Sequence, residues 1–180
     1  MSQVYSHPKN AVTSFIALLR AVNVGGTGKL PMSDLRALCE AAGFGGARTY
    51  IASGNVVFDS ALAEAEVKAS LEAKLAAYAG APVGVLVRTA TEMTAVLAAN
   101  LFPEAPRNRT VAIFLDDPPP TDALNSVTGR IDEEIGLGVR EIYVHYPSGM
   151  GQSKLKIPAA KAGTARNMNT VAKLAEMAGK

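Results

Sequence analysis

The chain has 180 residues, of which 48% are hydrophobic, so it can bury the core of one domain or of two small ones. Its formal net charge of +2 is too small to indicate a nucleic-acid or membrane partner by itself. The single cysteine, Cys39, excludes an intrachain disulfide and favours the reducing cytoplasm, and no apolar run reaches the ~20 residues that span a bilayer.

Strand and helix patterns alternate along the first half of the chain. Residues 1–13 are polar and predict a disordered tail. Apolar spacing and turn residues then predict strands at 14–19, 48–52, 55–59 and 83–88, and helices at 32–42 and 63–79. The resulting order over residues 14–90, β-α-β-β-α-β, is that of a ferredoxin-like (αβ-plait) unit, an antiparallel sheet with both helices on one face.

Two local signals refine this prediction. Tyr78 continues the apolar stripe of the second predicted helix at helical spacing, so it is expected to face the core. Thr89 and Glu92 have the spacing of a capping box, which predicts that a further helix begins there.

The second half, residues 91–180, predicts a second, related αβ layer packed as a subdomain on the first, which makes the whole chain α+β. Its elements are a strand at 109–115, a short helix at 122–127, a hairpin at 131–137 and 140–146, and a final helix. That helix is expected to start near Asn167 or Asn169, and either residue or Thr164 is a suitable N-cap. The element order is similar to that of the first half, but no sequence repeat supports a duplication.

Three segments carry a resemblance to a known family. They are LLRAVNVGG at 18–26 with LPM at 30–32, RTYIASGNVVF at 48–58, and SKL at 153–155 with TARNMNTV at 164–171. Together they resemble the DUF1697 family, bacterial proteins named as a domain of unknown function.

The resemblance implies an αβ-plait architecture with two ferredoxin-like parts, and it brings no established activity, cofactor or catalytic residue. This chain departs from the family at two positions. The family commonly has Gly where Ala21 stands, and an aromatic residue, usually Trp, where Met168 stands. The second departure removes a side chain on which a ligand could stack.

The loop between the first strand and the first helix contains Gly25 and Gly26 and ends at Lys29. A strand, a Gly-rich loop and a helix N-terminus form a common anion-binding geometry. The spacing fails both nucleotide signatures, because Leu30 stands where a Walker A loop needs Ser or Thr, and Pro31 where a dinucleotide loop needs its third Gly. Two interpretations remain, a cradle of N–H groups beside Lys29 or a tight turn with positive φ.

Two other segments carry polar groups suited to a ligand. Ser53 and Asn55 lie between two predicted strands, where ordinary turn chemistry accounts for them, yet Asn55, like Asn23, can also orient a ligand. Arg166 is predicted at a helix N-terminus, where the macrodipole makes a cation unfavourable by roughly 0.3–1 kcal/mol unless an anion lies between them. The alternative is a solvated arginine that points away.

Catalytic and metal-binding patterns are poor. His7 and His145 lack Cys or Glu at ligand spacing, so no metal site is predicted. Cys39 lies on an apolar helix stripe, which favours a structural thiol. Ferredoxin-like sheets often bind RNA through aromatic side chains, but the RNA-recognition pattern is absent, so a nucleic-acid partner is disfavoured.

The leading hypothesis is a small-ligand or anion-binding protein with a composite site between the Gly-rich loop and the segment 153–170. The alternatives are an enzyme that performs phosphoryl or acyl chemistry in the same cleft, and a protein or RNA interaction module. The sequence identifies no cofactor and no oligomeric state. The candidate ligand-binding residues are Asn23, Gly25, Gly26, Lys29, Ser53, Asn55, Lys154, Arg166, Asn167 and Asn169.

Overall fold

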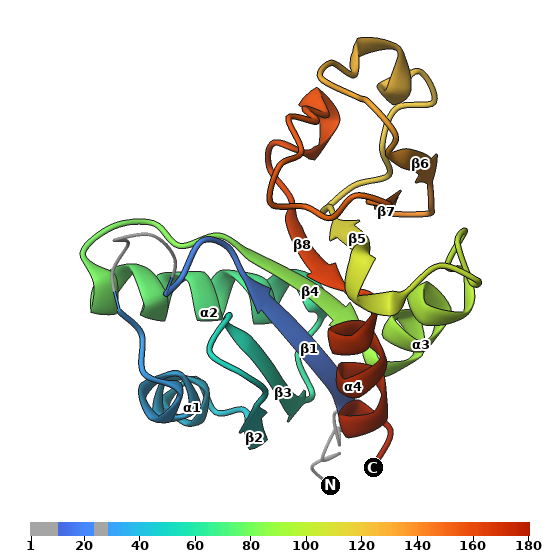
Figure 1. Ribbon diagram of the computed structural model, residues 1–180. Helices are drawn as coiled ribbons and strands as arrows, with labels where there is room; N and C mark the ends of the chain where they lie inside the picture. Colours follow the sequence, from blue (N-terminus) through green and yellow to red (C-terminus); the bar gives the residue numbers. More distant parts are fainter. Residues whose placement is uncertain (1–10, 24–28) are drawn as a thin grey trace, which may run out of the picture.

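The computed structural model describes residues 11–23 and 29–180 (Figure 1). Within them the chain forms two four-stranded antiparallel sheets and four α-helices, a mixed α+β fold. Among the described residues, none of the helices combines the length and the apolar composition that a membrane span requires. Of the tail predicted at 1–13, residues 1–10 lie outside the described residues, and the prediction is wrong for Thr13, which belongs to the first strand.

The first sheet has the strand order β2-β3-β1-β4. Its strands are β1 (Thr13–Leu19), β2 (Gly45–Thr49), β3 (Asn55–Ser60) and β4 (Val85–Thr89), and its helices are α1 (Met32–Ala41) and α2 (Glu64–Ala79). The predicted element order β-α-β-β-α-β is therefore present, with both central strands, β1 and β3, paired antiparallel.

The second sheet repeats this strand order as β6-β7-β5-β8. Its strands are β5 (Thr110–Phe114), β6 (Glu134–Leu137), β7 (Glu141–His145) and β8 (Thr164–Asn167). Two short 3₁₀ helices, Ala123–Ser126 and Pro158–Ala160, stand in the chain order where the first sheet has α1 and α2. The segment predicted as a helix at 122–127 is thus a 3₁₀ turn.

Two further helices, α3 (Ala90–Ala98) and α4 (Met168–Ala178), pack between the sheets (Figure 1). Phe15 and Leu19 of β1 pack on the side of α1 and α2, whereas Ile16 and Leu18 contact the cluster that contains α3 and α4. Both faces of β1 are therefore buried, which explains why its sequence is a continuous apolar run.

Four predictions are confirmed or refined by local geometry. The capping box is present, because the Thr89 N–H donates to the Glu92 carboxylate at 2.8 Å and the Glu92 N–H donates to Thr89 Oγ1 at 3.1 Å. The last helix begins at Met168 with Asn167 as its N-cap, whose Oδ1 accepts from the Thr170 N–H at 3.0 Å. The predicted hairpin forms through the pairing of β6 with β7, and the Cys39 side chain is buried.

Three further predictions are wrong. Strand β2 ends at Thr49, and Ile51, which a strand at 48–52 would contain, has a left-handed φ of 48°. Tyr78 is 45% exposed, because its hydroxyl reaches out to Asp34 at the end of the apolar stripe. Arg166 belongs to strand β8 and not to a helix N-terminus. The predicted unfavourable interaction between its charge and a helix macrodipole is therefore not the basis for an anion site.

Candidate functional site

The end of β1 and the start of β3 lie side by side. Leu18 is opposite Asn55 in the sheet, and the Leu19 N–H donates to the Gly54 carbonyl at 2.9 Å. Gly54 has a φ of 81°, and a Cβ atom there would lie 2.6 Å from Val22 Cγ2, so only glycine fits. The antiparallel pairing thus brings two of the predicted segments together.

Arg166 of β8 brings the third segment to the same place. Its side chain is buried, with 8% exposed, and its Nε donates to Asn55 Oδ1 at 2.6 Å. Its Nη2 donates to the carbonyls of Leu19 at 2.9 Å and Ser53 at 3.0 Å, and its Nη1 donates to Thr164 Oγ1 at 2.7 Å and to the Ala165 carbonyl at 2.9 Å. We call Leu19, Ser53, Asn55, Thr164 and Arg166 the Arg166 network.

The charge of Arg166 has no counter-charge within the described residues. Every acceptor in the Arg166 network is neutral, and none of the ion pairs formed by the described residues includes Arg166. Burial lowers the pKa of Arg166 to about 10, so the guanidinium still carries its charge at neutral pH. The three segments that supply the Arg166 network, 18–33, 41–58 and 142–175, contain no Asp or Glu that could provide a counter-charge.

Asn55 and Arg166 each fix the direction of one hydroxyl group in the Arg166 network. The Asn55 side chain is fully buried, and its Nδ2 donates to the Tyr50 carbonyl and to Ser53 Oγ, both at 2.9 Å. Ser53 Oγ therefore accepts a hydrogen bond from Asn55, and Thr164 Oγ1 accepts one from Arg166, so each hydroxyl proton is directed to another acceptor.

Asn23 joins the two ends of the Gly-rich loop. Its Oδ1 accepts from the Leu30 N–H at 2.7 Å, and its Nδ2 donates to the carbonyls of Leu30 at 2.9 Å and Ala52 at 2.8 Å. Asn23 has a φ of 55°, a conformation that Asn adopts more readily than most residues. Gly25 and Gly26 lie outside the described residues.

Arg20, which sequence analysis did not single out, links β1 to the turn before β8. Its Nε donates to the Gly163 carbonyl at 3.0 Å and its Nη2 donates to the Lys161 carbonyl at 2.8 Å. Arg20 thus contacts the segment that carries Arg166, while Arg166 contacts the end of β1. Arg20 and Thr164 each lie in a segment without Asp or Glu and within one of the three motifs that resemble the DUF1697 family, which was the signal present in the sequence.

The remaining candidates are less closely associated with the Arg166 network. Lys29 is exposed beside the N-terminus of α1, and Asn169 is exposed in the first turn of α4. Asn167 is the N-cap of α4. Lys154 is exposed. Two residues further along the chain, Lys156 forms an isolated antiparallel bridge with Thr128.

Other side chains with chemical potential are occupied elsewhere. His145 Nδ1 lies 2.8 Å from Glu134 Oε1, where β7 pairs with β6 in the second sheet. Among the described residues, no group of three or more His, Cys, Asp or Glu side chains is placed to hold a metal ion. Met168 is fully buried between the sheets, so its position belongs to the core and offers no surface for stacking.

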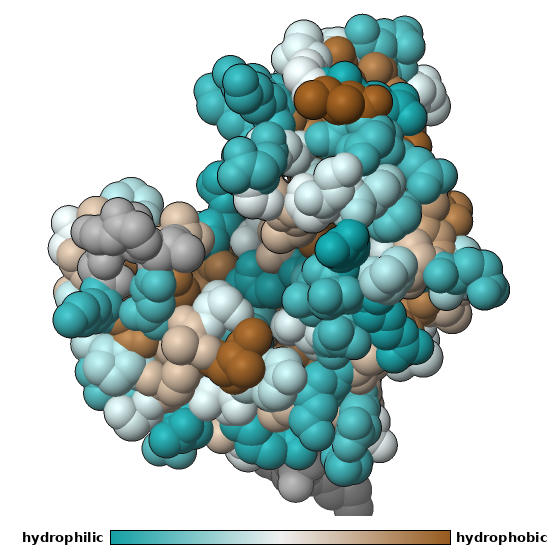
Figure 2. All heavy atoms as spheres, in the orientation of Figure 1, coloured by the Kyte–Doolittle hydropathy of each residue, from teal (hydrophilic) through white to brown (hydrophobic). Residues whose placement is uncertain are grey.

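The space-filling view is hollowed between the surface over α1 and α2 and the surface over the second sheet, and hydrophilic atoms lie at the bottom of the hollow (Figure 2). The segments of the Arg166 network come from these two parts of the molecule, the ends of β1 and β3 on one side and β8 on the other. The three predicted motifs therefore meet in part, the first through the Leu19 carbonyl, the second through Ser53 and Asn55, and the third through Arg166.

Comparisons with known proteins give a family and a structural neighbour. The chain is similar to the conserved bacterial protein SP0830 from Streptococcus pneumoniae, with a TM-score of 0.77 and 25% sequence identity over 93% of this chain and 99% of that chain. No curated protein matches it. A family described as "Protein of unknown function (DUF1697)" matches residues 12–143, so the chain belongs to the DUF1697 family, as the three motifs indicated.

Proposed function

We propose that the protein binds a small anionic molecule in the hollow beside the Arg166 network. The observation that carries this proposal is the buried positive charge of Arg166, which only neutral oxygens surround. A buried charge without a partner of opposite sign is unfavourable, and an anion nearby relieves that cost. At about 5 Å and an effective dielectric of about 20, two unit charges attract by roughly 3 kcal/mol before the anion's desolvation is counted.

Arg166 acts through the field of its charge and makes no hydrogen bond to the ligand in this proposal. Its five N–H groups already donate to the protein, so direct contacts must come from other groups. The hydroxyls of Ser53 and Thr164 are suited to this role because each already accepts a hydrogen bond and has its proton to donate. Asn55 and Arg166 then serve as positioning residues.

Lys29, Lys154 and the remaining candidates have a lesser role in this proposal. Their exposed positions suit long-range attraction of an anion, whose strength falls with ionic strength. Asn23 links Leu30 to the β2–β3 connection, because its Nδ2 donates to the carbonyls of Leu30 and Ala52. This contact fixes the residue that precedes Ser53.

We also infer that residues 14–90 are a ferredoxin-like unit and that residues 91–180 are a second unit related to it. The support is the shared strand order, β2-β3-β1-β4 in one sheet and β6-β7-β5-β8 in the other, together with the matching places of the helical segments. In this proposal the ligand lies where the ends of β1 and β3 of the first unit meet β8 of the second.

The binding proposal is tested with inorganic phosphate as the probe. Titration of the ¹⁵N-labelled protein with phosphate, against sodium chloride at equal ionic strength, should shift the amide signals of Ser53, Gly54 and Thr164 selectively. Thr164→Val removes the donor proton and should weaken phosphate binding about tenfold, the value of one hydrogen bond to a charged group.

Thr164→Ser retains the hydroxyl and should restore the binding. Thr94→Val is the matched control, because Thr94 is exposed on α3 and its hydroxyl donates to the Ala90 carbonyl. If phosphate and chloride produce the same shifts, or if Thr164→Val binds phosphate as tightly as Thr94→Val does, the proposal is wrong.

A further inference from the structure

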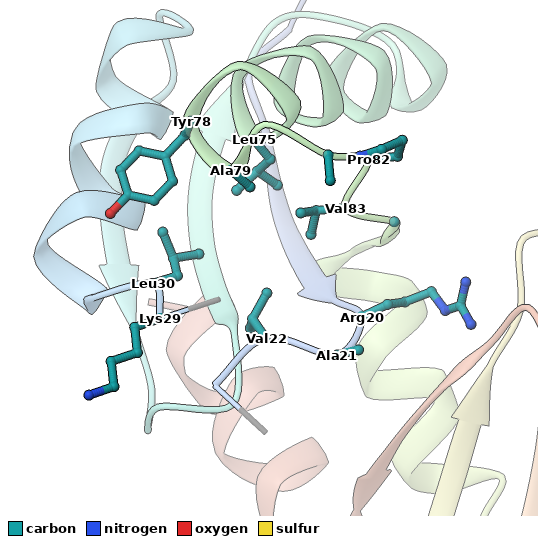
Figure 3. A pocket seen from close by; sticks show the side chains of 12 residues that line it. Arg20, Ala21, Val22, Lys29, Leu30, Leu75, Tyr78, Ala79, Pro82 and Val83 are labelled. Atoms are coloured by element: carbon teal, nitrogen blue, oxygen red, sulfur yellow. The ribbon is translucent and has the colours of Figure 1, made fainter. Parts of the chain in front are cut away.

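A second concave site lies on the other side of Arg20, next to α1 and α2. It is a cavity of about 660 Å³, a size typical of small-molecule sites. Its walls come from the end of β1, the last turn of α2, the connection from α2 to β4 and the entry to α1 (Figure 3).

The interior of this cavity is apolar. Val22, Leu30, Leu75, Ala79 and Val83 point toward a shared space (Figure 3). Leu30 and Leu75 continue the core of the first sheet, with 5% and 1% of their surface exposed, so the cavity floor is the core itself. Ala79 stands exposed at the edge of the cavity, which leaves apolar surface in contact with water.

The rim of the cavity carries Arg20 on one side, and Lys29 with Tyr78 on the other (Figure 3). The stems of Arg20 and Lys29 line the wall while their charged ends point away from the centre (Figure 3). Neither cation forms an ion pair with any Asp or Glu of the described residues. The Tyr78 hydroxyl donates to Asp34 Oδ2 at 2.6 Å, so the carboxylate on that side is already occupied.

From this geometry we infer that the cavity binds a small amphipathic anion, with its apolar body against Leu75, Ala79 and Val83 and its anionic group at the rim beside Lys29. The apolar body contributes by burial of its surface against these side chains. The anionic group selects the orientation, because Lys29 forms no ion pair with the described residues, whereas Arg20 on the opposite side already donates to the carbonyls of Gly163 and Lys161. This site is separate from the Arg166 network and does not depend on the phosphate proposal.

The test uses 1-anilinonaphthalene-8-sulfonate, an amphipathic anion that fluoresces in apolar surroundings, with octanoate as the competitor. We expect saturable binding of one molecule per chain and displacement by octanoate. Ala79→Phe fills the cavity and should abolish binding, whereas Ala77→Phe, an exposed position on α2 outside the cavity wall, should leave it unchanged. Lys29→Glu should weaken binding about fivefold by reversing one exposed charge.

Circular dichroism and a cooperative thermal transition must show that each variant is folded, since this dye also binds partly folded chains. If Ala79→Phe does not fold, the amide shifts of Leu30, Leu75 and Val83 on titration of the unmodified protein with octanoate take its place. Unchanged dye binding in folded Ala79→Phe, or no octanoate shifts at these residues, would overturn the assignment. Unchanged affinity in Lys29→Glu would overturn the anionic class.

Discussion

Arg166 Nε donates a hydrogen bond of 2.6 Å to Asn55 Oδ1, across 111 residues of sequence and between the two sheets of the molecule. This contact places a guanidinium with 8% exposure among the carbonyls at the ends of β1 and β3. The same arginine thus joins β8 to the first sheet and supplies the positive charge on which the proposed anion site depends.

Arg166→Ala should destabilise the protein by about 3 kcal/mol, because it leaves several buried acceptors without donors. Urea unfolding followed by circular dichroism measures this change. Arg109→Ala is the matched control, since Arg109 is exposed and its side chain donates to the Pro147 carbonyl alone, so a change within about 1 kcal/mol is expected there. Equal effects of the two substitutions would show that Arg166 has no special structural role.

Ala21→Gly should stabilise the protein. Ala21 has a φ of 51°, a left-handed conformation that costs roughly 1–2 kcal/mol for a residue with a Cβ. Glycine removes that cost but loses more backbone entropy on folding, so the expected gain is about 0.5 kcal/mol. Thermal unfolding measures it, with Ala77→Gly on the exposed face of α2 expected to destabilise by about 1 kcal/mol. A lower melting temperature for Ala21→Gly contradicts the prediction.

Stability should fall at alkaline pH through Cys39. Burial, with a smaller effect from Glu40, raises the pKa of the Cys39 thiol to about 12. In the unfolded chain the thiol ionises near pH 8.5, so between about pH 9 and 12 the unfolded state binds fewer protons and unfolding becomes more favourable. The slope reaches about 1.4 kcal/mol per pH unit.

Cys39→Ala removes this contribution and should flatten the alkaline decline measured by urea unfolding at a series of pH values. Tyr143 and Tyr146, whose pKa values burial also raises, remain in both proteins and contribute equally to both curves. Parallel curves for the two proteins would refute the assignment to Cys39.

Sequence patterns predicted the elements whose signals are local and regular. The apolar run of β1, the helical spacing of Leu35 and Cys39, and the capping box of Thr89 and Glu92 all depend on neighbours within a few residues. These signals were sufficient to predict the order of elements in the first sheet.

Elements and contacts that depend on distant segments were not predictable in this way. Ile51 has the composition of a strand residue, but the turn that brings Ala52 to Asn23 and Gly54 to Leu19 forces it to a positive φ. Strand β8 has only four residues, and its pairing with Ala112 and Ile113 determines it rather than its own sequence.

The position of Arg166 at a helix N-terminus was predicted wrongly, and its association with an anion stays a prediction. Its positive charge was associated with an anion through a helix macrodipole, whereas the structure places it on a strand with neutral acceptors from three segments. Only the absence of Asp and Glu from the segments 18–33, 41–58 and 142–175 was visible in the sequence as a sign of this uncompensated charge.

Asn55→Asp is the most direct test of the proposed anion site, because it supplies the missing counter-charge from within the protein. The carboxylate accepts from Arg166 where Asn55 Oδ1 does now, at the cost of the hydrogen bonds to Tyr50 and Ser53. The decisive measurement is the affinity for phosphate of the unmodified protein and of folded Asn55→Asp, by amide shifts at constant ionic strength. Our account predicts binding by the unmodified protein and at least about tenfold weaker binding by the variant; equal affinity, or none in either protein, would contradict it.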